Sequence, residues 1–257
     1  MANSIELGIR DLSGCLEAYL YVDARLHPRV DRPFYLHLAD LRQAIGVFET
    51  SDQISILDYG CGGSPYRSLF PNSEYIRADF SYCRDLDLVL PSDSSVPAPD
   101  RSFDMVLSTQ VLEHVPEPAH YIAESFRVLK PGAVLVLTTH GLYEEHGCPY
   151  DFQRWTSDGL RLLLEGAGFR IIEIKKLTCG PRALCFFVTE GIWQLVAPKR
   201  SLFGFVMWGL RGFWRINPGW LNRCADKYFK QYSVVDAGAT TDTTYIALLV
   251  QAERPSD

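Results

Sequence analysis

The chain has 257 residues, 47% of them hydrophobic and 22% charged, which is the composition of a soluble globular protein with a sizeable core. Its formal net charge of −6 disfavours general nucleic-acid binding, because such binding depends on neutralising phosphates. The seven cysteines are scattered and form no CxxC pair, so we expect a reduced cytoplasmic protein without a metal centre or a disulfide framework. Neither a signal peptide nor a run of about 18 apolar residues that would predict a membrane-spanning helix is present.

Hydrophobic spacing divides the chain into four regions. Residues 1–50 carry apolar side chains at helical spacing and are predicted to form a helical cap. Residues 51–180 alternate short apolar runs with helical stretches, an order that favours a doubly wound parallel sheet. Within this core we expect strands over 54–57, 74–78, 86–89, 103–108, 133–138 and 169–175, and helices over 121–129 and 157–165. Residues 241–257 hold a last strand, predicted over 243–252, and a tail.

Residues 181–240 are predicted to form an aromatic and basic helical insertion before the last strand. So long a link is not a hairpin, and its aromatic composition argues against disorder. Trp208, Trp214 and Trp220 occur there together with several lysines and arginines. Two uses of residues 181–232 stay open. One is packing on the main domain or on a second subunit of a homodimer. The other is peripheral membrane contact, with tryptophans at headgroup depth and basic side chains on anionic lipid.

The turn after the first strand is the first candidate binding site. Residues 56–64 read Ile-Leu-Asp-Tyr-Gly-Cys-Gly-Gly-Ser, an apolar strand followed by an acid and a glycine-rich turn. Glycines let a ligand approach the backbone, and ligands of open α/β sheets lie at the carboxyl ends of the strands. The spacing is D-x-G-x-G, whereas a dinucleotide site has G-x-G-x-x-G directly before a helix. The acid, Asp58, suits a cationic ligand better than a pyrophosphate.

This turn resembles motif I of the class I S-adenosylmethionine (SAM)-dependent methyltransferases. The resemblance implies a Rossmann-like, seven-stranded, mostly parallel sheet with an antiparallel last strand, and SAM as the cofactor. It assigns Asp58 to the region of the cofactor's amino group, and it assigns cofactor contacts to the backbone of Gly60, Cys61 and Gly62. The sequence departs from the family at Ser64, where many members have a third glycine; we keep Ser64 among the cofactor-binding residues.

Further positions extend the same resemblance along the core. Asp79 ends the second strand and is expected to bind the ribose hydroxyls, with Phe80 beside the adenine. Asp93, or its neighbour Ser92, lies where the family contacts the adenine amine, and Gln110 begins a stretch that borders the methionine part. The stretches 96–106, 110–115 and 130–132 also match the family, and its type 11-like subgroup in particular. The pair of residues 113 and 114, Glu-His, is interpreted as shape-holding and not as a catalytic dyad.

The loop over residues 146–156 points to the chemistry. It resembles the H-x-x-P-x-D-[YF]-x-R-[YW]-T pattern of a subgroup associated with polysaccharide and lipid-linked glycan pathways. His146 is the first candidate base, His140 the second and His37 a weaker third. Asp151 either orients His146 or binds a substrate hydroxyl, and Arg154 offers a fork for a carboxylate or phosphate. Alternatively, Asp151 and Arg154 form an ion pair that fixes the loop, with Thr156 as a helix N-cap.

The sequence therefore predicts a SAM-dependent methyltransferase acting on a small-molecule, glycan or lipid-linked acceptor, with oxygen as the expected target. The alternative is a methyltransferase-fold protein that binds SAM without catalysis. A nicotinamide-dependent oxidoreductase is disfavoured because the G-x-G-x-x-G fingerprint is absent. A nucleic-acid methyltransferase is disfavoured because Ser-Thr-Gln-Val, and no N-P-P-Y-type tetrad, follows the strand over 103–108. The expected location is the cytoplasm, with peripheral membrane contact as an option.

Overall fold

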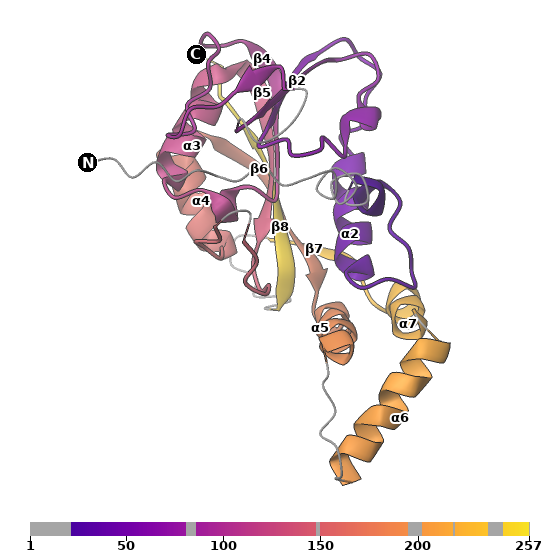
Figure 1. The fold of residues 1–257 in the computed structure, drawn as a ribbon. Coiled ribbons are helices and arrows are strands. Elements are labelled where there is room, and N and C mark those ends of the chain that lie inside the picture. The colour runs from indigo at the N-terminus through magenta and orange to yellow at the C-terminus, as the bar shows by residue number, and fades with distance from the viewer. Residues whose placement is uncertain are drawn as a thin grey trace, which may run out of the picture.

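A computed structural model describes residues 22–80, 86–147, 150–194, 202–217, 219–235 and 244–256 (Figure 1). The core contains one eight-stranded sheet of strand order β3-β2-β1-β4-β5-β8-β6-β7. Its strands are β1 (Ser55–Tyr59), β2 (Glu74–Asp79), β3 (Leu88–Val89), β4 (Phe103–Thr109), β5 (Leu129–His140), β6 (Arg170–Cys179), β7 (Tyr232–Val234) and β8 (Tyr245–Glu253).

Strand pairing confirms a mostly parallel sheet with an antiparallel last strand. β3, β2, β1, β4 and β5 pair in parallel, and β8 lies antiparallel between β5 and β6. The predicted strand count of seven is wrong, because β7 pairs antiparallel with residues 175–177 of β6. The region predicted as a helical insertion therefore also supplies an edge strand, which satisfies backbone groups that β6 would otherwise leave unpaired.

Helices cover both faces of the sheet (Figure 1). α2 (Tyr35–Gly46) lies on one face, and α3 (Pro118–Val128) and α4 (Ser157–Gly166) lie on the other. Side chains of β1 alternate between these layers, as strand geometry requires. Ile56 packs in the cluster of buried residues that includes Leu41 of α2, whereas Leu57 packs in the cluster that includes Leu160 of α4.

Helix ends follow local chemistry. α3 begins at Pro118, three residues before the predicted start, because proline is tolerated in a first turn, where its missing N–H would have no helical partner. α4 begins after Thr156, whose hydroxyl accepts the N–H of Gly159 at 3.1 Å, so the predicted N-cap is confirmed. The helix predicted in the first 21 residues lies outside the described residues.

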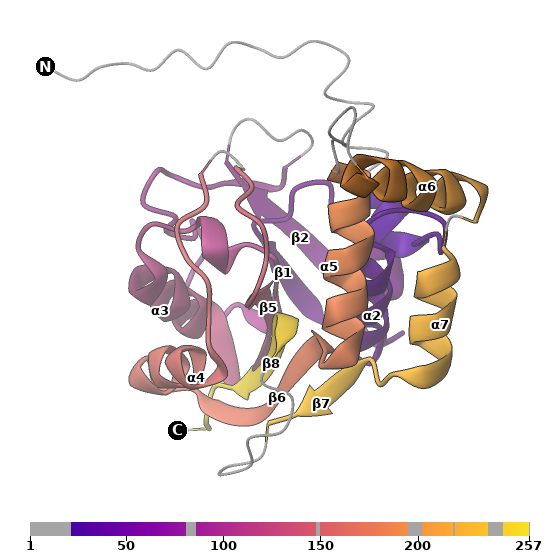
Figure 2. The ribbon, with the colours of Figure 1, turned by 90° about the horizontal axis from the view of Figure 1, so that it is seen from below.

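Three more helices follow β6: α5 (Pro181–Gln194), α6 (Leu202–Ile216) and α7 (Trp220–Tyr228). α5 and α7 lie against α2 (Figure 2), around a small cluster of buried side chains. The cluster consists of Leu36, Ala183, Phe186, Ala225 and Ile246. None of the described helices has the length and apolarity needed to cross a membrane.

A buried ion pair fastens this C-terminal helical layer to α2. Arg182 of α5 donates two hydrogen bonds to the carboxylate of Asp40, at 2.8 and 2.7 Å, and a third to Asp226 of α7 at 2.8 Å. Thr178 of β6 donates to Asp40 at 2.8 Å. The side chains of Arg182 and Asp40 are both fully buried, so four elements meet at one charged centre.

Candidate active site

The glycine turn follows β1 at the carboxyl edge of the sheet. Gly60 and Cys61 donate their N–H groups to the carbonyl of Ala78, at 2.9 and 3.1 Å, which ties the turn to β2. Gly60 has φ 77°, and a Cβ there would lie 2.6 Å from the side chain of Val111, so this position needs glycine. Gly62 has φ 50°, and a Cβ there would meet none of the described residues within 4 Å. The backbone of Gly62 therefore borders open space that a ligand can approach.

Two acidic side chains, those of Asp58 and Asp79, lie next to this turn. Asp58 on β1 is buried and accepts a hydrogen bond from the hydroxyl of Tyr75 at 2.8 Å. Burial raises the pKa of Asp58 to about 7, and the bond from Tyr75 opposes part of that rise. Asp79 at the end of β2 accepts the N–H of Gly62 at 2.7 Å and that of Phe80 at 2.7 Å. Asp79 thus fixes the backbone of the turn, and Phe80 packs against the adjoining hydrophobic cluster.

The remaining turn residues have structural partners. Ser64, at the departure from the family pattern, has φ 50°, and its hydroxyl accepts a hydrogen bond from Arg77 at 3.2 Å. This contact uses a side chain that glycine lacks, which gives the departure a physical role. Cys61 is buried, and burial together with the nearby Asp58 and Asp79 raises the pKa of its thiol to about 12. Cys61 is therefore a packing residue and not a nucleophile.

Gln110 follows β4 at the same edge of the sheet. Its backbone N–H donates to the carbonyl of Thr138 at 2.9 Å, and its φ is 57°. The side chain is 7% exposed, yet neither its amide oxygen nor its amide nitrogen has a hydrogen-bond partner among the described residues. Because a buried unpaired amide is costly, these atoms suit contact with a polar ligand. Gln110 and the open side of Gly62 fit the cofactor site that the sequence predicts.

Asp93 lies in the turn after β3. Its exposed carboxylate accepts the N–H of Ser95 at 3.0 Å, and this bond lowers the pKa of Asp93. The hydroxyl of Tyr59 donates to the carbonyl of Ser94, which fastens this turn to β1. The ring of Tyr59 stacks on that of Tyr121 at 3.9 Å. The predicted adenine contact of Asp93 stays a prediction.

A histidine cluster lies at the end of β5, beside the candidate cofactor site. The ring of His140 stacks on Tyr143 at 3.9 Å between centroids, and it lies 5.4 Å from His37 of α2 and 5.1 Å from His146. His114 lies 4.9 Å from His146. The structure thus brings together all three candidate bases. Tyr143 and His114 complete the cluster. No sequence pattern points to Tyr143, because only the fold places it on His140.

Burial separates the three candidate bases. It lowers the pKa of His37 to about 3 and lowers that of His140 still further, so both imidazoles are neutral. His146 is different because its side chain is 35% exposed. Its Nδ1 lies 3.2 Å from the carbonyl oxygen of Glu144 and 3.5 Å from a carboxylate oxygen of Asp151. With Nδ1–H directed at these acceptors, Nε2 is left as the proton acceptor.

Asp151 and Arg154 form the ion pair that fixes the loop. Two nitrogens of the Arg154 guanidinium donate to the two carboxylate oxygens of Asp151, and this pairing lowers the pKa of Asp151 to about 2. Arg154 also donates to the carbonyls of Tyr143 and Glu144. Asp151 in addition accepts the backbone N–H of His146 at 3.0 Å. The same carboxylate therefore fixes the loop and orients His146.

Glu113 anchors the loop from the other side. Its backbone carbonyl accepts the N–H of Phe152 at 2.8 Å, and its buried carboxylate accepts the hydroxyl of Thr139 at 2.8 Å. Glu113, His114 and His146 each offer a ligand atom, all within 4.8 Å of one another, and form the sole such group that the described part of the chain contains. Two ligands of one zinc ion at about 2.1 Å cannot be more than about 4.2 Å apart. Atoms that lie up to 4.8 Å apart can exceed this span, so the grouping alone does not indicate a metal site.

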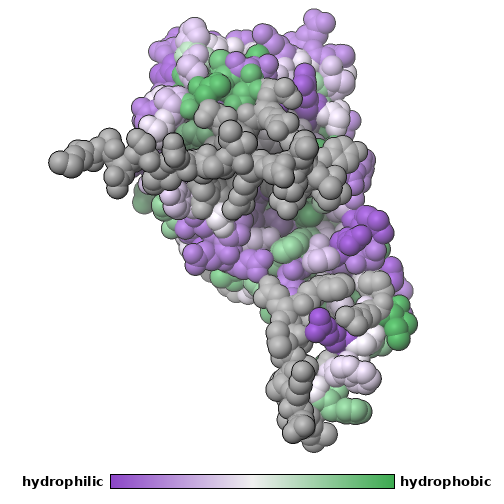
Figure 3. All heavy atoms as spheres, viewed as in Figure 1, coloured by the Kyte–Doolittle hydropathy of each residue, from purple (hydrophilic) through white to green (hydrophobic). Residues whose placement is uncertain are grey.

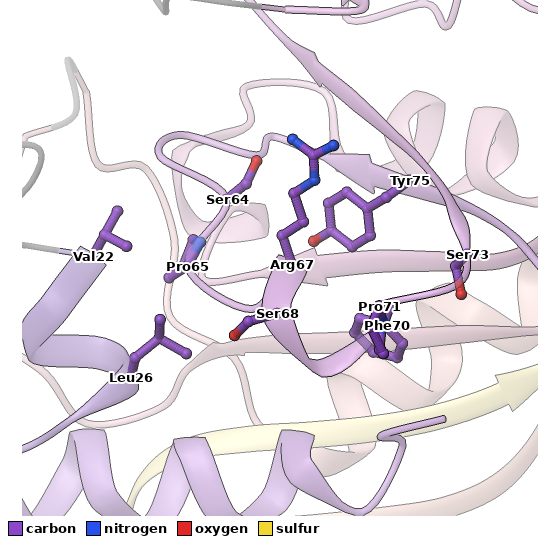
Figure 4. A pocket seen from close by; sticks show the side chains of 10 residues that line it. All are labelled: Val22, Leu26, Ser64, Pro65, Arg67, Ser68, Phe70, Pro71, Ser73 and Tyr75. Carbon is purple, nitrogen blue, oxygen red and sulfur yellow. The ribbon is translucent and has the colours of Figure 1, made fainter. Parts of the chain in front are cut away.

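A hollow of about 450 Å³ lies near the turn (Figure 4). It is lined by residues of the 22–26 segment and of the connection from β1 to β2: Val22, Leu26, Ser64, Pro65, Arg67, Ser68, Phe70, Pro71, Ser73 and Tyr75. Neither Gly62 nor Asp79 lines it. Because the residues assigned to the cofactor-facing side of the turn do not line this hollow, we do not assign it to the cofactor.

Comparison with known proteins identifies the core segment. Residues 57–137, from β1 to β5, match the family described as "Methyltransferase domain". A probable S-adenosylmethionine-dependent methyltransferase of Mycolicibacterium smegmatis is 37% identical over 84 residues, which are 30% of this chain and 33% of that protein. The 2-methyl-6-phytyl-1,4-hydroquinone methyltransferase of Synechocystis is 36% identical over 133 residues, or 45% of this chain and 40% of that protein.

Solved structures share the fold. The [4+2]-cyclase SpnF superposes with a TM-score of 0.53 at 18% identity, covering 90% of this chain and 86% of that one. The chain spans about a third to two fifths of the length of the two relatives above. The sequence matches thus identify the core segment: residues 57–137 match a methyltransferase domain.

Proposed function

We propose that the chain as a whole is a SAM-dependent methyltransferase that transfers the methyl group to an oxygen of a small-molecule, glycan or lipid-linked acceptor. The observation that supports it most is the carboxyl edge of the sheet. There, the open backbone at Gly62 and the unpaired buried amide of Gln110 lie in the segment that matches the methyltransferase family. A candidate base, His146, lies at the same edge.

Cofactor binding is assigned to the turn. The backbone of Gly62, held by Asp79, lies against the cofactor, and the amide of Gln110 hydrogen-bonds to its methionine part. The carboxylate of Asp58, on β1 before the turn, stabilises the positive charge of the amino group of SAM. Bound SAM supplies an activated methyl group on a sulfonium; the chain supplies alignment and the exclusion of water.

Proton removal from the acceptor is assigned to His146. A hydroxyl is a poor nucleophile until its proton leaves, whereas a neutral amine needs no base. Nε2 of His146 accepts the hydroxyl proton, and Asp151 stabilises the imidazolium that forms. The buried neutral His140 holds the ring of His146 in place through its edge contact. The acceptor of the Synechocystis relative carries a phytyl chain, by its name, so an amphipathic acceptor is compatible with a domain of this kind.

The first test is calorimetric titration of the purified chain with SAM and S-adenosylhomocysteine, with NAD and NADP as controls. We expect binding of the first two ligands alone. Asp79→Ala should weaken SAM binding by about a hundredfold or more, because the bond that holds the Gly62 amide is lost. Asp52→Ala, which removes an exposed acid before β1, is the matched control. Equal SAM affinity in wild type and Asp79→Ala would refute the assigned site.

The second test addresses the acceptor atom. On a panel of hydroxylated acceptors, His146→Gln should lower kcat by about a hundredfold or more while leaving SAM affinity unchanged. His120→Ala, which removes an exposed histidine on α3, is the control. Full activity of His146→Gln on a hydroxyl acceptor would exclude His146 as the base. SAM binding without turnover of any acceptor would favour the non-catalytic alternative.

A further inference from the structure

α6 exposes an unusual amount of apolar surface. Six large hydrophobic side chains on this helix are 43–80% exposed, and we call them the α6 surface: Phe205, Val206, Trp208, Leu210, Phe213 and Ile216. α6 lies at the periphery of the molecule, beyond α5 and α7 (Figures 1 and 2). Apolar and polar side chains meet at this end of the molecule in Figure 3.

The α6 surface occupies one side of the helix. At about 100° per residue, its six members cover an arc of about 200°, from Trp208 through Phe205 to Leu210. Trp214 projects from the opposite side and is 7% exposed, so it fastens the helix to the rest of the chain. On the wide apolar side, Phe213 contacts the ring of Trp220 of α7 at 6.0 Å between centroids, and all six side chains remain 43–80% exposed.

Basic residues border this surface. Arg211 lies about 60° beyond Trp208 on the helical projection and is exposed. Arg223, Lys227 and Lys230 on and after α7 are also exposed. Between residues 195 and 235 the sequence has seven lysines and arginines and one acid, Asp226. Asp226 is engaged with Arg182 and Tyr35, so its charge is compensated within the protein.

The α6 surface and the candidate active site lie toward the same edge of the sheet. β6 runs parallel to β5, because both pair antiparallel with β8. α5 starts directly after the carboxyl end of β6, and its Phe186 lies 6.0 Å from Tyr143 of the histidine cluster. The helix that leads to α6 thus forms one wall beside His140 and His146.

We propose that the α6 surface docks the protein on an anionic lipid bilayer. An in-plane helix buries its apolar side at the level of the acyl chains, with tryptophan at headgroup depth and arginine or lysine beside lipid phosphates. α6 has this composition, and its 15 residues span about 22 Å, less than the roughly 30 Å of a hydrocarbon core. It therefore lies along a membrane and does not cross it. In a dimer formed through the α6 surface, the basic residues of one copy would lie close to those of the other. Repulsion between these like charges disfavours that arrangement.

The test is co-sedimentation of the full chain with vesicles of phosphatidylglycerol and phosphatidylcholine, compared with vesicles of phosphatidylcholine alone. We expect binding to the anionic vesicles that weakens as salt is added. The variant Phe205→Ser/Trp208→Ser/Ile216→Ser should lower the partition coefficient by at least about tenfold. The matched control is Val47→Ser/Leu162→Ser/Ile172→Ser, since these side chains are as exposed but lie elsewhere. Circular dichroism and SAM titration confirm that each variant is folded.

The charged border is tested separately. Arg211→Gln/Lys230→Gln should reduce the salt dependence while leaving part of the binding. Absence of wild-type binding to anionic vesicles, or equal binding of the α6 triple variant, would overturn the proposal. Self-association in sedimentation experiments that the triple variant abolishes, without vesicle binding, would assign the surface to a second copy instead. Because vesicle binding is read without turnover, its outcome is independent of whether the chain transfers methyl groups.

Discussion

β8 and α6 are both apolar segments, yet β8 is buried in the core and α6 is exposed at the surface. Residues 245–250 of β8 are all buried, because this strand lies between β5 and β6 and has a helical layer on each face. The six side chains of the α6 surface are exposed. Hydrophobicity alone therefore does not decide burial. Position does: β8 fills a gap that the sheet leaves, whereas α6 lies outside every layer that Figure 1 shows.

The largest expected effect is at the buried ion pair that joins α5 to α2. Arg182→Ala removes one partner of a fully buried ion pair and leaves the Asp40 carboxylate uncompensated. We expect a loss of about 3–5 kcal/mol in the free energy of unfolding, measured by urea denaturation. Arg29→Ala, which breaks the exposed pair with Asp31, should change it by less than about 1 kcal/mol. Similar values for both variants would contradict the role of Arg182.

The difference in burial between β8 and α6 is tested by one alanine substitution on each. Leu249→Ala on β8 should lower the free energy of unfolding by about 2–5 kcal/mol, because it leaves a cavity in the core. Phe205→Ala on α6 removes a larger side chain, yet the change should stay within about 0.5 kcal/mol, since Phe205 is 70% exposed. A loss above about 2 kcal/mol for Phe205→Ala would show that α6 packs inside the folded protein.

Asp58 makes a pH-dependent contribution to the stability of the core. Its pKa rises to about 7 in the folded chain, so folding favours the protonated carboxyl. The contribution is complete below the unfolded pKa of about 3.9 and is lost as the pH rises through about 7. The free energy of unfolding of the ligand-free protein should therefore fall between about pH 4 and pH 7, and this group should contribute little change above pH 7. Asp58→Asn should show a smaller fall, and an equal fall in both proteins would place the titration elsewhere.

The smallest effect is expected at the N-terminus of α4. Thr156→Ala removes the hydroxyl that accepts the N–H of Gly159, so we expect a loss of about 1 kcal/mol. Thr156→Ser retains that hydroxyl and should keep most of the stability. Thermal or urea unfolding of the three proteins gives the comparison, and equal stability of Thr156→Ala and wild type would mean that water replaces the cap.

Local pattern predicted much of the core. The apolar runs after residues 51, 74 and 103 gave β1, β2 and β4 to within two residues, because buried parallel strands read as short apolar stretches. The glycine turn and the cap at Thr156 were predictable for the same reason, since their contacts are local. β7 was not, because three residues of an edge strand carry no periodicity and pair with a strand more than 50 residues away.

The site was predicted less completely than the core. His37, His140 and His146 were singled out separately, but nothing in the sequence shows that α2 brings His37 to the end of β5. The pairing of Asp151 with Arg154 was one of two open alternatives, and the geometry shows that the pair also fixes the orientation of His146. Which histidine reaches solvent depends on tertiary packing, and that decides which one can exchange a proton with an acceptor.

The central place of β8 has a consequence for how the chain is made. β8 is synthesised after every other described strand of this sheet, yet it joins β5 to β6. While the ribosome is still adding residues before 245, β5 and β6 each have an exposed strand edge, and such edges invite aggregation. The sheet can close only after β8 has emerged from the ribosome. Its closing contacts span more than 100 residues between β5 and β8, so we expect slow folding and a need for protection in the cell during that interval.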